Sequence, residues 1–469
     1  MERLTTLDAG FLHAEDADRH VSLAIGGLAV LAGPAPDHES LMSTFAVRVN
    51  RCPRLGQRLR IHPFDLSAPQ WIPHGDFDLA HHVRRIALPQ PGDDGALHRT
   101  VADLMAMRLD RDRPLWEVWV IEGLTDDRWA MLTKVHHCMA DGIAATHMLT
   151  GLCDDAADDS SADRVRAANP TDPPKPEGPD WTLNPLKLAN ALWHTSTSVA
   201  TAAVRVAQGA AEIAVDLARP AAASTLNGPV SNLRRYSAAR VPMRDVVSVC
   251  ERFDVTVNDV ALAAITEGYR AMLIRRGEQP LPDSLRTLVP VSMRSADAVH
   301  ATDNRVSMLL PQLPVGEEHP LRRLEAVHSR VGRTRSHGQH RAGNAFVTAA
   351  NRIPFPVTAW AVRLLARVPQ RGVMTLATNV PGPRRRLTVM GREMLSLFPI
   401  PPIAMNMRTG VAMLSYADGL FFGILADYDT VPDVDALARG IELAVARLAA
   451  CSRHRRGCAH RGLILVETA

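Results

Sequence analysis

Cysteine is scarce in this chain, and so are lysine and long apolar runs. Six cysteines among 469 residues are too few for the disulfide scaffold that is typical of small secreted proteins. Only three of the 53 basic residues are lysines, and the formal net charge is +3. This near balance of charge argues against nucleic acid as a partner, because a nucleic-acid-binding protein needs a larger basic surface.

No apolar run is long enough to cross a membrane. The longest charge-free candidate, residues 188–204, has 17 residues and contains Asn190, His194 and five serines or threonines. A membrane-spanning helix needs about 20 mostly apolar residues. The N-terminus also lacks the apolar stretch of a signal peptide. We therefore expect a cytoplasmic protein.

The length favours more than one domain, and the sequence patterns divide the chain into four parts. Residues 1–153 and 236–450 mix strand and helix patterns, so each is expected to form an α/β domain. Residues 154–235 start with a linker rich in Asp, Ser and Pro and continue into an Ala-rich helix over 183–217. Residues 451–469 form an Arg-rich tail. Because ligand sites favour domain interfaces, we expect one active site between the two domains.

Hydrophobic periodicity predicts individual elements in the first domain. Asp37 is expected to cap a helix that carries Leu41, Phe45 and Val49 on one face. Strands are expected over residues 21–31 and 129–137, and a helix is expected over 96–109. In the second domain, helices are expected over 260–273 and 433–449.

The stretch richest in chemistry lies at the end of the predicted strand 129–137. His136 and His137 are adjacent there, and Asp141 and Gly142 follow. Neighbouring side chains of a strand point to opposite faces, so only one histidine can face a given cleft. A neutral imidazole is a good general base near pH 7, and no Gly-x-Ser-x-Gly elbow supplies a serine nucleophile. The pattern favours direct transfer to an acceptor hydroxyl, while a purely structural role of the stretch stays open.

Metal binding is the alternative for these side chains. Because His136 and His137 diverge and no His-Glu-x-x-His pattern is present, we expect no metal site at the motif. A second group of cysteines and histidines, in the Arg-rich tail, has a spacing that could bind zinc. Matching ligands elsewhere in the chain are not evident, so zinc binding by the tail stays open. The members of this group are Cys451, His454, Cys458 and His460.

Several motifs together resemble a known family. His136-His137-x-x-x-Asp141-Gly142 is similar to the signature of the CoA-dependent acyltransferase superfamily, which includes chloramphenicol acetyltransferase and the condensation domains of peptide synthetases. Further blocks, each weak alone but specific in this order, resemble the bacterial wax ester synthase/diacylglycerol acyltransferase family from about residue 4 to residue 450. They are Leu4-Thr-Thr-Leu-Asp8-Ala-Gly-Phe11-Leu, Pro114-Leu115-Trp116-Glu117, Asn258-Asp259, Val289-Pro-Val-Ser-Met-Arg294, Asp303-Asn304-Arg305-Val306-Ser307 and Thr378-Asn379-Val380-Pro381-Gly382-Pro383.

The resemblance implies a fold and an activity. The fold is α/β (α+β), with two chloramphenicol-acetyltransferase-like domains and the active site in a tunnel between them. The activity is transfer of a long-chain acyl group from acyl-CoA, a substrate rather than a cofactor, to diacylglycerol or a long-chain alcohol. The products are triacylglycerol or wax esters. An acyltransferase for another lipid or secondary-metabolite hydroxyl, and a non-catalytic lipid-binding relative, stay open as alternatives.

The resemblance also assigns roles to residues. His137 is the general base, and His136 faces the other side of the strand. Asp141 is expected to pair with Arg58, or else with Arg294, and so to fix the loop. Asn258 is the candidate donor to the oxyanion, or supports the site from behind. Supporting positions are Gly142, Asp259, Pro114, Leu115 and Trp116, the last three as the wall of an acyl pocket or as plain core.

A lipid acceptor requires contact with a lipid surface. One candidate contact is the helix over residues 183–217, which alternatively packs against the protein. The other is the loop of Arg384, Arg385 and Arg386, which alternatively is solvated or attracts CoA phosphates. We expect peripheral association with the inner face of the membrane or with lipid droplets.

Overall fold

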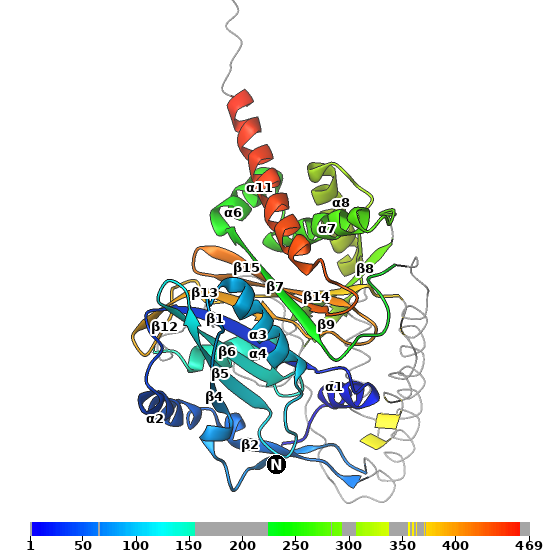
Figure 1. Ribbon diagram of the computed structural model, residues 1–469. Coiled ribbons are helices and arrows are strands. Elements are labelled where there is room, and N and C mark those ends of the chain that lie inside the picture. Colours follow the sequence, from blue (N-terminus) through cyan, green and yellow to red (C-terminus); the bar gives the residue numbers. More distant parts are fainter. Residues whose placement is uncertain are drawn as a thin grey trace, which may run out of the picture.

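The described residues of the computed structural model form two large β-sheets, flanked by helices, and a small two-stranded sheet (Figure 1). Most of the predicted linker and the whole predicted helix over 183–217 lie outside the residues that it describes. The described residues are 2–63, 66–154, 224–282, 284–292, 306–336, 355–356, 359–360, 363, 370 and 372–459.

The first sheet is centred on strand β6 (Arg128–His136). β6 lies between β1 (Ala24–Ala32) and β5 (Trp116–Leu124) and is antiparallel to both. All but the first of its residues are buried, as its nearly continuous apolar pattern predicts. The described strands follow the order β12-β13-β1-β6-β5-β4, and the other members are β4 (Val83–Ala87), β12 (Thr388–Val389) and β13 (Arg392–Ile400).

The second sheet is mixed. β11 (Thr375–Val380) is parallel to both of its neighbours, β14 (Thr409–Tyr416) and β8 (Leu285–Ser292). β14 and β15 (Gly419–Asp427) form an antiparallel hairpin, and β15 pairs with β7 (Arg234–Pro242). The described order is β10-β8-β11-β14-β15-β7, with β9 (Val306–Leu309) also on β8 and β10 (Gln312–Leu313) at the edge.

The sheets do not follow the predicted division at residues 153 and 236. β13 comes from the C-terminal half, yet it pairs antiparallel with β1 of the first sheet, with Phe398 opposite Leu28. The carboxylate of Asp154 accepts backbone N–H groups of Met390 and Gly391 at the turn before β13. Strand periodicity predicts which face is buried, but it does not name the partner strand. The domain boundaries themselves stay a prediction.

Local signals account for several helices. α2 (His38–Val49) begins after Asp37, whose carboxylate accepts the N–H of Ser40, and it buries Leu41, Phe45 and Val49 as predicted. The other described helices are α1 (Thr6–Ala17), α3 (Asp94–Ala106), α4 (Gly142–Gly151), α6 (Met243–Phe253), α7 (Val257–Arg275), α8 (Pro320–Ser336) and α11 (Val434–Ala459). Short 3-10 helices are η1 (Pro53–Gly56) and η3 (Leu79–His81), and a small hairpin joins β2 (Gln57–Arg60) to β3 (Gln70–Pro73).

Helices α6, α7, α8 and α11 gather at one end of the molecule, beyond the second sheet (Figure 1). α7 and α11 pack closely because each has a glycine at the crossing: a Cβ on Gly440 would lie 2.8 Å from Cα of Gly268. α11 continues to Ala459, ten residues past the predicted end at residue 449, so it enters the predicted Arg-rich tail. None of the described helices is long and apolar enough to span a membrane.

Candidate active site

The backbone of the double-histidine motif is anchored on two sides at the end of β6. His136 is the last strand residue, and its N–H donates to the carbonyl of Leu115 at 3.0 Å. The next N–H, of His137, donates to the carbonyl of Leu23 at 2.9 Å. A central strand has partners on both edges, so the position of both histidines follows from the sheet.

The expectation that both histidines belong to the strand and point to opposite faces is wrong in one respect. The strand ends at His136, and His137 begins the turn that leads to α4. Strand alternation therefore does not apply to His137. The ring of His136 is buried and that of His137 is half-buried, yet both contact the same helix, α1.

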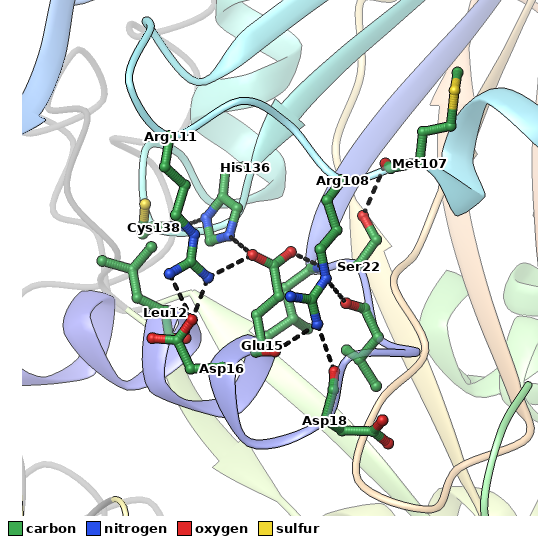
Figure 2. Close-up of polar contacts among 12 residues, drawn as sticks. Leu12, Glu15, Asp16, Asp18, Ser22, Met107, Arg108, Arg111, His136 and Cys138 are labelled. Atoms are coloured by element: carbon green, nitrogen blue, oxygen red, sulfur yellow. Dashed lines mark hydrogen bonds and ion pairs between the residues drawn. The ribbon is translucent and has the colours of Figure 1, made fainter. Parts of the chain in front are cut away.

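The tautomer of His136 follows from its two neighbours. Its Nδ1 accepts the backbone N–H of Cys138 at 3.1 Å. Nδ1 is therefore unprotonated, and the neutral ring carries its hydrogen on Nε2. Nε2 faces Oε2 of Glu15 at 3.4 Å, and both side chains are only 2% exposed (Figure 2).

Glu15 is the centre of a buried polar cluster (Figure 2). Its Oε1 accepts the N–H of Leu23 at 3.0 Å, and its Oε2 accepts Nη2–H of Arg111 at 2.6 Å. Burial alone would raise the pKa of the Glu15 carboxyl, but His136, Arg111 and the Leu23 N–H lower it to about 2. The same carboxylate raises the pKa of Arg111 against the effect of burial. Glu15 is therefore ionised and held in place.

The ring of His137 stacks on the ring of Phe11. The two centroids are 4.1 Å apart and the planes differ by 12°. A stack this close restricts rotation of the imidazole, because tilting either ring would drive its edge into the other. His137 is thus a half-buried imidazole of restricted orientation at a strand end.

Asp141 acts as the N-cap of α4. Its Oδ1 accepts the N–H of Ala144 at 2.9 Å, which satisfies one of the free donors at the helix start. The predicted partner Arg58 lies on β2, and the ion pairs of the described residues do not include one between Arg58 and Asp141. In that stretch it is Arg54 that forms an ion pair, with Glu2. Arg294 lies outside the described residues.

Gly142 is the place where the second sheet reaches the motif. A Cβ on Gly142 would lie 2.7 Å from Cγ2 of Val380, the last residue of β11. Only glycine permits this approach without displacing Val380. The contact joins the motif to the Asn379-Val380-Pro381 block from the other half of the chain.

Pro114, Leu115 and Trp116 are buried, and their described contacts are those of core residues. Nε1–H of Trp116 donates to the carbonyl of Leu55 at 2.8 Å, and the Trp116 ring stacks on His82 at 4.6 Å. Together with the Leu115 carbonyl that holds His136, these contacts fix the start of β5 beside the end of β6. A role in an acyl pocket stays a prediction.

Asp259 and Asn258 lie in the first turn of α7. The Asp259 carboxylate and Thr256 form a capping box, and Nδ1 of His328 lies 2.9 Å from the same carboxylate. Asp259 therefore stabilises the start of α7 and links it to α8. Within the described part of the chain α7 packs mainly on α11, α8, α6 and β10. The role of Asn258 as oxyanion donor stays a prediction.

Lys134 lies two residues before His136 and is fully buried. Its Nζ donates to the carbonyls of Leu104, at 2.8 Å, and Met107. These carbonyls belong to the C-terminal end of α3, where a cation is favourable. Burial lowers the pKa of Lys134 to about 8. Lys134 is therefore a structural cap that ties α3 to β6.

Sequence reasoning missed three contacts of the site: Phe11, Glu15 and Arg111. In the sequence Phe11 belongs only to a family block, and the patterns predict no helix there. Had α1 been predicted, the four-residue spacing of Phe11 and Glu15 would have placed both on one face. Arg111 gives no local signal, since its partner lies 96 residues away.

Metal binding was the alternative for the motif. Among the described residues, no three or more His, Cys, Asp or Glu side chains lie together so that they could hold a metal ion. In the predicted zinc group, Cys451 is half-buried on α11, and His460 lies outside the described residues.

Comparisons with known proteins find relatives that span nearly the whole chain. The probable diacylglycerol O-acyltransferase tgs1 of Mycobacterium tuberculosis is 61% identical over 464 residues, which is 99% of each chain. The structure of the wax ester synthase/diacylglycerol acyltransferase from Marinobacter aquaeolei is similar with a TM-score of 0.68 and 26% identity, covering 96% of this chain and 100% of that one. The first condensation domain of the calcium-dependent antibiotic synthetase has a TM-score of 0.61 at 17% identity, with 96% of both chains covered.

These structures confirm the predicted two-domain fold of the chloramphenicol-acetyltransferase type, while the tunnel between the domains stays a prediction. Family models cover most of the sequence. Residues 302–449 match the WS/DGAT C-terminal domain, and residues 4–261 match the wax ester synthase/diacylglycerol acyltransferase catalytic domain. With two family models in order and a 61% identical relative over 99% of its length, the chain belongs to the wax ester synthase/diacylglycerol acyltransferase family.

Proposed function

We propose that this chain transfers a long-chain acyl group from acyl-CoA to the free hydroxyl of diacylglycerol, giving triacylglycerol, with His137 as general base. Long-chain alcohols are a second class of acceptor and give wax esters. The observation that carries the proposal is the half-buried imidazole of His137, which the end of β6 positions and Phe11 orients. The 61% identity to a probable diacylglycerol O-acyltransferase supports the choice of acceptor.

The reaction is a single displacement at the thioester. The imidazole of His137 takes the proton of the acceptor hydroxyl as its oxygen attacks the thioester carbonyl carbon. The tetrahedral intermediate then collapses, the carbon–sulfur bond breaks, and the imidazolium returns the proton to the departing sulfur. The products are the ester and free CoA, and His137 ends in its starting form.

A covalent acyl-enzyme on the neighbouring cysteine is disfavoured. Cys138 lies beside His137 in the chain, but its side chain is buried and burial raises the pKa of its thiol well above the usual value. The thiolate is the nucleophilic form, so this cysteine is unreactive near neutral pH. Direct transfer needs no such nucleophile.

The test is an assay of CoA release and ester formation with one long-chain acyl-CoA and either diacylglycerol or hexadecanol. His137→Ala should lower kcat by roughly 10²- to 10⁴-fold, the usual range for loss of general-base help. The matched control is His81→Ala, because His81 is an exposed histidine on η3 that pairs with Asp78. The control should keep the wild-type rate.

Three outcomes would change the assignment. Near-normal turnover by folded His137→Ala protein would exclude His137 as the base. Turnover only with another lipid or secondary-metabolite hydroxyl would keep the mechanism and change the acceptor. Absence of CoA release with every acceptor would favour a non-catalytic lipid-binding relative.

Because diacylglycerol resides in a lipid phase, we also propose that the protein reaches it by peripheral contact with the inner face of the membrane or with lipid droplets. Of the two candidate contacts, only the loop of Arg384, Arg385 and Arg386 belongs to the described residues, and all three arginines are exposed. Arg386 also forms an ion pair with Glu393. Exposed guanidinium groups attract anionic headgroups, which supports this loop as a contact.

A further inference from the structure

One face of α1 contacts both histidines of the motif. Phe11 and Glu15 are four residues apart on this helix, so their side chains lie one above the other. The ring of Phe11 stacks on His137, and the carboxylate of Glu15 faces Nε2 of His136. Two consecutive side chains of the motif are thus oriented by one turn of a single helix.

α1 is itself firmly anchored at the turn that carries Glu15. Arg108 donates from Nη2 to the carbonyl of Glu15 at 2.6 Å and from Nε to the carbonyl of Val21 at 2.8 Å. Arg111 bridges the carboxylates of Glu15 and Asp16, each at 2.6 Å (Figure 2). Charge-assisted hydrogen bonds of this kind are short and strong, so the helix has little freedom to shift.

The backbone of His137 is fixed by the sheet, which leaves rotation of its side chain as the remaining freedom. A general base must aim a lone pair at the acceptor proton, and an error of about 1 Å in position can cost about 10²-fold in rate. The parallel Phe11 ring at 4.1 Å is a contact that sets the plane of the imidazole.

We propose that α1 positions the catalytic base: Phe11 sets the ring plane of His137, and Glu15 holds α1 against the motif through His136. The proposal rests on the proposed role of His137 as general base. Phe11 and Glu15 are positioning residues, because they act through the histidines and not on the substrate.

The first test is steady-state kinetics of Phe11→Leu, with Phe11→Tyr as the variant that keeps the ring. Phe11→Leu should lower kcat by about 10-fold or more and leave KM for acyl-CoA within about 2-fold, because only the base is misplaced. Phe11→Tyr should recover most of kcat. If Phe11→Leu does not fold, Phe11→Met, which is unbranched and adaptable, carries the same expectation.

The matched control is Phe45→Leu, which removes a fully buried ring from α2. It should lower the melting temperature at least as much as Phe11→Leu does, and keep kcat near wild type. The pH profile of kcat/KM adds a second readout, because its acid limb reports the free enzyme's essential base. That limb should move in Phe11→Leu and stay in place in Phe45→Leu.

A double-mutant cycle with His137→Ala decides whether Phe11 acts through the base. In that background Phe11→Leu should have no further effect on the residual rate. An equal loss in both backgrounds, or wild-type kcat and pH profile in folded Phe11→Leu, would overturn the positioning proposal while His137→Ala still establishes the base. Wild-type turnover by His137→Ala would instead refute the proposed base and this inference with it.

Discussion

Among single residues, Glu15 is the one whose ionisation matters most for stability near the motif. A buried carboxylate is costly unless charges and hydrogen bonds compensate it. Here His136, Arg111 and the N–H of Leu23 supply that compensation. The cluster therefore links the stability of the folded chain to pH.

Because the pKa of Glu15 is lowered to about 2 in the folded chain, it stabilises the fold above its ordinary value of 4.5, and this stabilisation is lost as the pH falls from there towards 2. At about 1.4 kcal/mol per pKa unit, the contribution is at most about 3.5 kcal/mol. Glu15→Gln should melt at a lower temperature than wild type at pH 7, and the difference should shrink as the pH approaches 3. Thermal melts between pH 7 and pH 3 measure this.

The control for that series is Glu39→Gln, an exposed glutamate in the first turn of α2. Its melting temperatures should follow those of wild type within a few degrees across the series. A constant difference between Glu15→Gln and wild type at every pH would show that Glu15 does not contribute through its charge.

Among the elements, α4 has a glycine at each end, and the two glycines have different surroundings. Its first residue, Gly142, lies against Val380, whereas no atom of the described residues lies within 4 Å of a Cβ built on its last residue, Gly151. The same substitution at the two ends therefore separates close packing from helix propensity.

Gly142→Ala should be destabilising by about 1–3 kcal/mol, because the added methyl group overlaps Val380 and must push the end of β11 away. Gly151→Ala should be neutral or stabilising by up to about 1 kcal/mol, since alanine favours helix. Urea unfolding of both variants provides the comparison. Equal stability of the two proteins would mean that the Gly142–Val380 contact is not restrictive.

For the whole molecule, two segments of the C-terminal half contact the first sheet and its motif. β13 completes the first sheet, and the end of β11 reaches the motif at Gly142. The exposed arginine loop 384–386 lies in the stretch between these two strands. A lipid surface that binds this loop would therefore contact a segment that is close in sequence to both β11 and β13.

Flotation with anionic liposomes tests that contact. Wild-type protein should float at low salt and release at high salt, because screening weakens attraction to the headgroups. Replacing Arg384, Arg385 and Arg386 with Ser should reduce flotation several-fold. A variant that replaces the exposed Arg244, Arg322 and Arg439 with Ser carries the same change in charge and should float like wild type. Protein that stays at the bottom at low salt would exclude peripheral binding through this loop.

Much of the local structure could be predicted from the sequence. The Asp37 cap, the buried face of α2 and strands β1 and β6 follow from side chains within a few residues of each other. The position of the double histidine at a strand end is correct for the same reason. The strand ends one residue earlier than predicted, so His137 lies in the turn. There its ring contacts Phe11 of α1.

The partners of these elements were decided only by the tertiary structure. Glu15 meets Arg111 and His136 across about a hundred residues of chain, Val380 meets Gly142, and β13 joins β1. Periodicity and capping arise from backbone geometry over one or two turns, so the sequence by itself determined the elements and, through its motifs, the family. Which elements lie together depends on packing and hydrogen bonding between distant segments, and these contacts, absent from any local pattern, assemble the site around His137.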